Sequence, residues 1–93
     1  MSSNYLWLIS HSTETNASYR AKNRRLAKKI TELLRKHKAS PEEVAEEIRI
    51  PHSRARNWYF RYTKISALDL LRLGMRFEGI REFVMETIDS SSD

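Results

Sequence analysis

Residues 44–58 read VAEEIRIPHSRARNW, and this stretch decides the fold. Apolar residues recur at helical spacing up to Ile48, break around Arg49 to Pro51, and resume beyond the break in a new phase. This pattern predicts two short helices joined by a tight turn. The side chains expected to face inward are Val44, Ala45, Ile48, Ile50, Ala55 and Trp58.

The outward face of the second helix is rich in hydrogen-bonding side chains and contains no acid. Its members are His52, Ser53, Arg56, Asn57, Phe60 and Arg61. Such a face suits the base edges and phosphates of DNA. Arg56 and Asn57 are the strongest candidates for base reading, because arginine pairs with guanine and asparagine with adenine in the major groove.

These residues resemble the helix-turn-helix motif of Cro/XRE-type repressors. The positions that match in type and spacing are Val44, Ala45, Ile48, Ile50 and Trp58, followed by the leucine pair Leu70 and Leu73. The resemblance covers about residues 20–88. The chain departs from the family pattern at the turn glycine (Arg49), the serine cap (Pro51), the isoleucine (Ala55), the residues after the tryptophan (Tyr59 to Arg61) and a common alanine (Gly74). A non-glycine residue in a left-handed turn is tolerated but strained.

The resemblance implies an all-α, five-helix Cro/repressor-like domain with a short N-terminal extension. It implies a transcriptional regulator, most simply a repressor, that binds a palindromic operator in double-stranded DNA as a homodimer. The residues expected to read bases are His52, Ser53, Arg56 and Asn57. The residues expected to contact phosphates are Arg54, Arg61 and Lys64, which position the protein without reading sequence.

The positive charge of the chain is unevenly distributed. The net charge is +5, with nine basic residues against Glu32 between Arg20 and Lys38, and five more against no acid between Arg49 and Lys64. A positive lobe of this kind favours a polyanionic partner. The alternative is that the basic run of the first helix is an ordinary solvated face.

The 93 residues divide into an extension (1–18), a helical domain (19–89) and a short tail (90–93). A first helix of about four turns is predicted from apolar spacing that begins at Tyr19. Ser40-Pro41-Glu42-Glu43 is a start signal for the second helix, which we expect to end near Ile48.

The third helix is expected to begin between Pro51 and Ser53 and to extend as far as Tyr62. The fourth should begin at Ser66 or Ala67, and Gly79 should separate it from the fifth. The side chains of the fourth helix expected to face inward are Leu70, Leu71, Leu73 and Phe77.

The apolar run Tyr5-Leu6-Trp7-Leu8-Ile9 is typical of an isolated strand or a docking arm. It could cover the protein's own core, pair with its copy in a second subunit, or dock on another protein as the interaction segment of an antitoxin does. A second candidate dimer surface is the stripe Phe83, Val84 and Ile88 on the fifth helix. The rival function is therefore a protein-interaction module on the same fold.

Several other classes are disfavoured. The chain has no cysteine, and no nucleophile-base pair, paired carboxylates, glycine-rich phosphate loop or metal cluster can be assembled from it. We therefore expect no enzyme activity, metal or cofactor. No window approaches a membrane span, so we expect a cytoplasmic protein that associates with the nucleoid if it is bacterial or from a phage.

Overall fold

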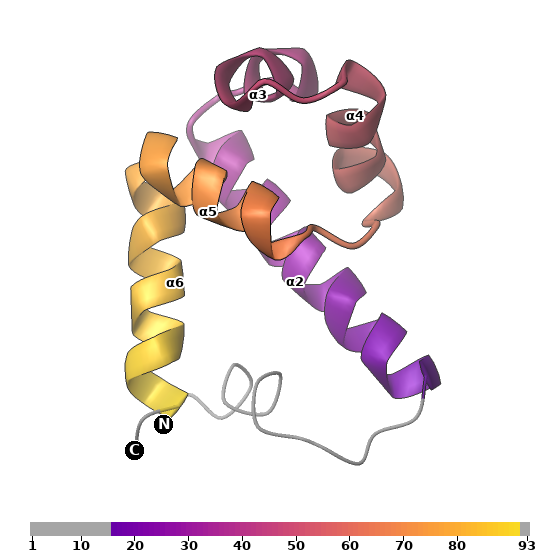
Figure 1. Cartoon of the computed structure of the whole chain (residues 1–93), viewed down its shortest axis with the longest axis vertical. Coiled ribbons are helices and arrows are strands. Elements are labelled where there is room, and N and C mark those ends of the chain that lie inside the picture. Colours follow the sequence, from indigo (N-terminus) through magenta and orange to yellow (C-terminus); the bar gives the residue numbers. More distant parts are fainter. Residues whose placement is uncertain (1–15, 92–93) are drawn as a thin grey trace.

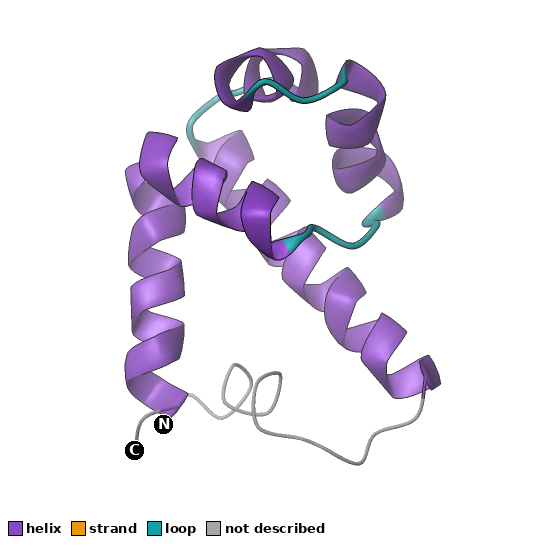
Figure 2. Ribbon diagram, in the orientation of Figure 1, coloured by secondary structure: helices purple, strands orange, loops and turns teal. Residues whose placement is uncertain are grey.

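The computed structural model describes residues 16–91, and this part of the chain folds into five helices without strands. Their bounds are α2 (Asn16–Lys36), α3 (Pro41–Ile48), α4 (His52–Arg61), α5 (Ala67–Arg76) and α6 (Glu78–Ser91). The all-α, five-helix prediction is confirmed (Figures 1 and 2). The apolar run of residues 5–9 lies outside the described residues.

Helix α2 is the longest element and begins earlier than predicted. It has 21 residues and starts at Asn16, whereas the sequence pattern indicated about four turns from Tyr19. The buried residues Ala27, Ile30 and Leu34 follow one side of its C-terminal half, where α4 and α6 pack. Tyr19, in the N-terminal half, lies outside this buried stripe and is 47% exposed.

Helix α3 begins as its sequence predicts. The Ser40 hydroxyl accepts a hydrogen bond from the Glu43 backbone N–H at 3.1 Å, and the Glu43 carboxylate accepts one from the Ser40 N–H at 2.8 Å. Pro41 occupies the first turn, where its missing N–H costs no hydrogen bond. Such a reciprocal cap contributes about 1 kcal/mol.

The turn between α3 and α4 has the conformation that the sequence predicted. Arg49 ends α3 in the left-handed region, with φ 62° and ψ 54°, although it is not glycine. Ile50 is buried at the corner, and Pro51 precedes α4 in an extended conformation without a side-chain cap. Tyr62 ends α4 in the same left-handed way, with φ 52°.

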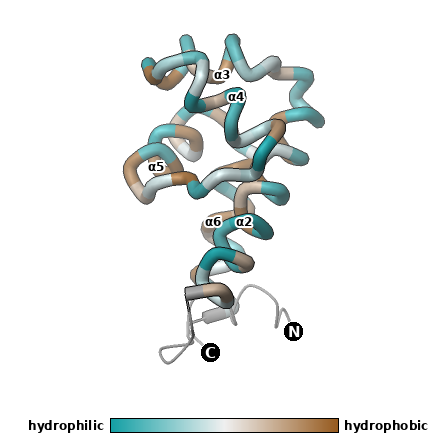
Figure 3. The backbone as a smooth tube through the Cα atoms, turned by 90° about the vertical axis from the view of Figure 1, so that its right-hand side faces the viewer, coloured by the Kyte–Doolittle hydropathy of each residue, from teal (hydrophilic) through white to brown (hydrophobic). Residues whose placement is uncertain are grey.

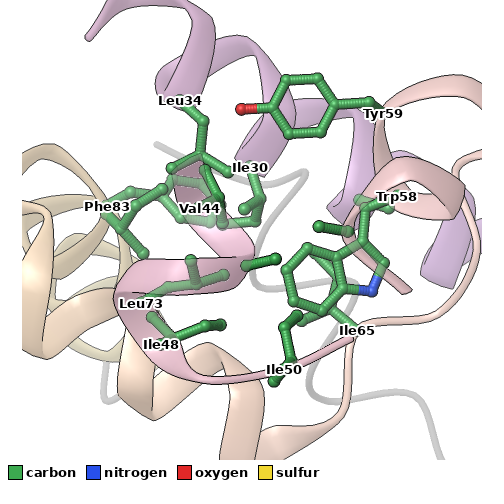
Figure 4. Close-up of a cluster of buried hydrophobic side chains, with 14 residues drawn as sticks. Ile30, Leu34, Val44, Ile48, Ile50, Trp58, Tyr59, Ile65, Leu73 and Phe83 are labelled. Carbon is green, nitrogen blue, oxygen red and sulfur yellow. The ribbon is translucent and has the colours of Figure 1, made fainter. Parts of the chain in front are cut away.

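Trp58 is part of the hydrophobic core. Its side chain is fully buried, as are Ile30, Val44, Leu73 and Ile80, so that all five described helices contribute to one cluster (Figure 4). This confirms Trp58 as a core residue. Tyr59 closes one edge of the cluster, where its hydroxyl donates a hydrogen bond of 2.7 Å to the Ala39 carbonyl. Burial raises the pKa of Tyr59 to about 12, so its hydroxyl keeps this proton at neutral pH.

The boundary between α5 and α6 lies at Phe77, so the prediction that Gly79 separates these helices is wrong. Phe77 has extended angles (φ −123°, ψ 111°), which end α5. Gly79 lies in the first turn of α6 and serves close packing instead. A Cβ at this position would stand 3.1 Å from Nε2 of His37, a contact tighter than most side chains tolerate.

The prediction that Leu71 faces inward is also wrong, since this side chain is 62% exposed. Helix α5 has leucines on both of its sides, so apolar spacing alone does not decide which side is buried. Asp69 and Leu73, four residues apart, face the core, and Leu71 therefore points away from it. Leu73 is fully buried as predicted.

Candidate nucleic-acid interface

Helix α4 buries Ala55, Trp58 and Tyr59 and exposes most of its other side chains. The exposed face has Ser53, Arg56 and Phe60 at a spacing of three and four residues, which places them on one side of the helix. Phe60 is 67% exposed, and Asn57 is partly buried beside this face. The polar residues predicted to read bases therefore share this side of α4 with one exposed aromatic ring, which lies in the last turn of the helix.

Two of the predicted base readers are paired with acids of α3. A guanidinium nitrogen of Arg56 lies 2.8 Å from a carboxylate oxygen of Glu42. The hydrogen bond from Arg56 is the main reason that the pKa of Glu42 lies below its ordinary value, so this carboxylate stays charged at neutral pH. The second pair joins Nε2 of His52 to the Glu46 carboxylate at 3.4 Å.

Arg54, predicted to contact phosphate, has a structural partner. One of its guanidinium nitrogens, Nη1, donates to both carboxylate oxygens of Asp69, at 3.2 and 2.9 Å. The Asp69 side chain is only 3% exposed, and its backbone N–H is capped by the Ser66 hydroxyl at 3.1 Å. Arg54 is half exposed, but this bond ties α4 to the first turn of α5.

A basic cleft lies where the N-terminal half of α2 meets the end of α4 and the segment that follows. The cleft has a volume of about 370 Å³, and its lining residues are Tyr19, Arg20, Asn23, Arg24, Arg61, Tyr62, Thr63 and Lys64. Four of these residues are cationic and none is acidic. Both residues that remain as predicted phosphate contacts, Arg61 and Lys64, line this cleft.

Two of the four cations of the basic cleft lie over its aromatic rings. The ammonium group of Lys64 lies 5.7 Å from the ring centroid of Tyr19, and the guanidinium of Arg24 lies 5.8 Å from that of Tyr62. Arg24 also donates a hydrogen bond of 3.1 Å to the Arg61 carbonyl. These contacts fix the direction of long side chains before any anion arrives, which lowers the entropy cost of binding one.

Sequence reasoning missed the contribution of α2 to this cleft. Arg20 and Arg24 belong to the basic run of the first helix, and their spacing of four places them on one face. That spacing was the available signal, but it gives no information on which other element lies opposite. A second hollow of about 430 Å³ shares Arg24 and Tyr62 with the cleft and adds Arg25 and Lys28.

The two predicted dimer surfaces have different outcomes. Residues 5–9 lie outside the described part of the chain. On α6, Phe83 is only 7% exposed and packs in the core, Val84 is partly buried, and Ile88 is 51% exposed. These three residues do not form the continuous exposed stripe that was expected. Within residues 16–91, no helix combines the length and apolar character that crossing a bilayer requires.

Scans against models of protein families, curated proteins and solved structures found no match to this chain.

Proposed function

We propose that this protein is a sequence-specific regulator of transcription that places α4 in the major groove of double-stranded DNA. The observation that supports this most strongly is the continuity of two surfaces. The exposed face of α4 has no acid of its own, and its C-terminal end opens into the basic cleft. The exposed face of α4 would then read bases in the DNA groove, and the adjacent basic cleft would bind the DNA phosphates.

In this proposal the outward residues of α4 have distinct roles. Arg56 reads guanine and Asn57 reads adenine, while His52 and Ser53 contact bases at the entrance of the helix. Phe60, exposed in the last turn of α4, contacts the methyl group of thymine. Arg61 and Lys64, joined by Arg24, contact phosphates. A homodimer on a palindromic operator would act by occupancy and would repress where its site overlaps a promoter.

Selection of bound sequences from a random DNA pool tests the reading face. We expect an enriched palindrome, against which Arg56→Ala or Asn57→Ala costs about 1 to 3 kcal/mol, or roughly 5- to 150-fold in Kd. Affinity for unrelated DNA should change much less, particularly for the uncharged Asn57. Arg81→Ala, which removes an exposed arginine from α6, is the matched control and should leave the preference unchanged.

The ion pair between Arg56 and Glu42 predicts a substitution that should increase operator affinity in the same measurement. Guanine can bind Arg56 only after displacing the Glu42 carboxylate, which lies 2.8 Å away. Glu42→Gln should therefore raise operator affinity. If both α4 variants retain the wild-type preference, α4 does not read the operator and the proposal fails.

The salt dependence of binding tests the basic cleft. Each neutralised phosphate releases counterions, so we expect a log-log slope on the order of −4 for a dimer. Affinity should then fall about 250-fold between 50 and 200 mM salt. Arg24→Ala, Arg61→Ala and Lys64→Ala should each weaken binding to all sequences alike and make the slope shallower by about 1 for each phosphate no longer neutralised.

Lys36→Ala, in the last turn of α2 and remote from the cleft residues in sequence, is the control for charge alone. It should change affinity less than Arg24→Ala does. A flat salt response, or an equal effect of the two substitutions, would refute phosphate binding in the cleft.

A further inference from the structure

Helix α5 has an apolar side that no other described element covers. Leu68, Leu71 and Met75 are 57%, 62% and 77% exposed, and their spacing of three and four residues aligns them along the helix. In Figure 3, α5 lies at the outer edge of the molecule and its tube has hydrophobic stretches there. Three large apolar side chains aligned in this way are typical of a surface that binds another helix.

These side chains line a groove between α5 and the end of α3. The groove has a volume of about 440 Å³, and the residues that line it are Glu47, Ile48, Arg49, Leu68, Leu71, Arg72, Met75 and Arg76. The lining therefore contains three arginines and one glutamate, and a carboxylate oxygen of that glutamate lies 3.9 Å from a guanidinium nitrogen of Arg76. The rim retains positive charge, so the complementary surface is an apolar helix face flanked by acids.

The outer face of α6 has this character. Met85 is 54% exposed, and exposed glutamates occur three residues before it, at Glu82, and one residue after it, at Glu86. Within Glu78–Asp89 the helix has four acidic residues against Arg81 alone. By contrast, packing α5 against its own copy would bring two arginine-rich rims together.

We propose that the groove of α5 binds α6 of a second copy of this chain, and that the contact is reciprocal. Met85 of one copy lies against Leu71 and Met75 of the other, and Glu82 and Glu86 pair with Arg72 and Arg76. This inference deepens the proposed homodimer by naming its interface, and it rests on that part of the proposed function. The sequence predicted residues 5–9 or the fifth helix, through Phe83, Val84 and Ile88, as the dimer surface. The proposed interface keeps the fifth helix, α6, but uses Met85 and its neighbouring glutamates and adds the groove of α5.

The test is the mass of the full chain in solution without DNA, measured by sedimentation over a range of concentrations. We expect the wild type to dimerise and Leu71→Lys to remain monomeric. Because Leu71 is exposed, this variant should keep the wild-type helical circular dichroism, and its melting temperature should fall only by the contribution of dimerisation. Phe60→Lys is the matched control, since Phe60 is 67% exposed against 62% for Leu71, and it should dimerise normally.

Exchange of charge identifies the occupant of the groove. Arg72→Glu and Glu86→Arg should each weaken dimerisation, by about tenfold or more, since each creates like-charge contacts. An equimolar mixture of the two variants should restore it, because in a reciprocal dimer both interfaces of the mixed pair regain opposite charges.

Three results would overturn the inference. The first is a wild type that is monomeric at all concentrations. The second is a dimer that Leu71→Lys does not weaken, which would indicate that residues 5–9 form the interface instead. The third is a dimer sensitive to Leu71→Lys but not to Glu86→Arg, which would indicate a different occupant. None of these measurements uses DNA, so failure here is distinguishable from failure of α4 to read an operator.

Discussion

Trp58→Ala should lower the free energy of unfolding by about 3 to 5 kcal/mol, because truncation of a fully buried indole leaves a cavity in the hydrophobic core. A small domain has a total stability of about 5 to 15 kcal/mol, so this loss is a large share of it. Urea denaturation followed by circular dichroism would show a lower midpoint and a less cooperative transition. Any loss of DNA binding should follow from unfolding.

Phe60→Ala is the control, since it removes an exposed aromatic side chain from the same helix. It should change stability by no more than about 0.5 kcal/mol, as is usual for surface substitutions. The opposite pattern, a stable Trp58→Ala variant that binds no DNA, would mean that the indole itself contacts the nucleic acid.

Arg54→Ala should also destabilise the fold, by about 2 to 4 kcal/mol, because it leaves the Asp69 carboxylate buried without its cation. Removing both partners in Arg54→Ala/Asp69→Ala should recover much of this loss, because the unpaired charge is then gone. Denaturant titration of the single and double variants measures the difference.

Arg61→Ala provides the comparison for this second prediction. It removes an exposed arginine from the same helix without leaving a buried carboxylate, so its stability should stay near that of the wild type. A fully stable Arg54→Ala variant with weaker DNA binding would contradict this structural role. It would instead support the sequence-based prediction that Arg54 contacts phosphate.

The parts of the fold that could be predicted depend on short-range signals. The capping box at Ser40, the proline of the first turn and the phase change around Arg49 act within a few residues, and the structure agrees with each of them. Trp58 was also recognised as a core residue, because its spacing from Ala55 places both on one side of α4.

What could not be predicted depends on contacts between distant segments. Leucines occur on both sides of α5, and the side that is buried contains Asp69, whose partner Arg54 lies 15 residues away. The basic cleft combines α2 with the end of α4, across the 37 residues that separate Arg24 from Arg61. The pairing of Glu42 with Arg56 likewise required the angle between two helices, which local periodicity does not specify.

The left-handed residues at the ends of α3 and α4 limit how this protein can be engineered for thermal stability. Glycine would adopt the backbone angles of Arg49 and Tyr62 without the steric cost of a side chain, which is on the order of 1 kcal/mol at each position. However, Arg49 lines the α5 groove and Tyr62 lines the basic cleft. At Arg49 a glycine should raise the melting temperature but would remove a side chain from the groove proposed to bind a second copy. At Tyr62 it would also remove a ring that packs against the core, so no gain in stability is expected there. Lys38 has the same left-handed conformation and lines neither surface, so it is the position at which a designer could introduce glycine first.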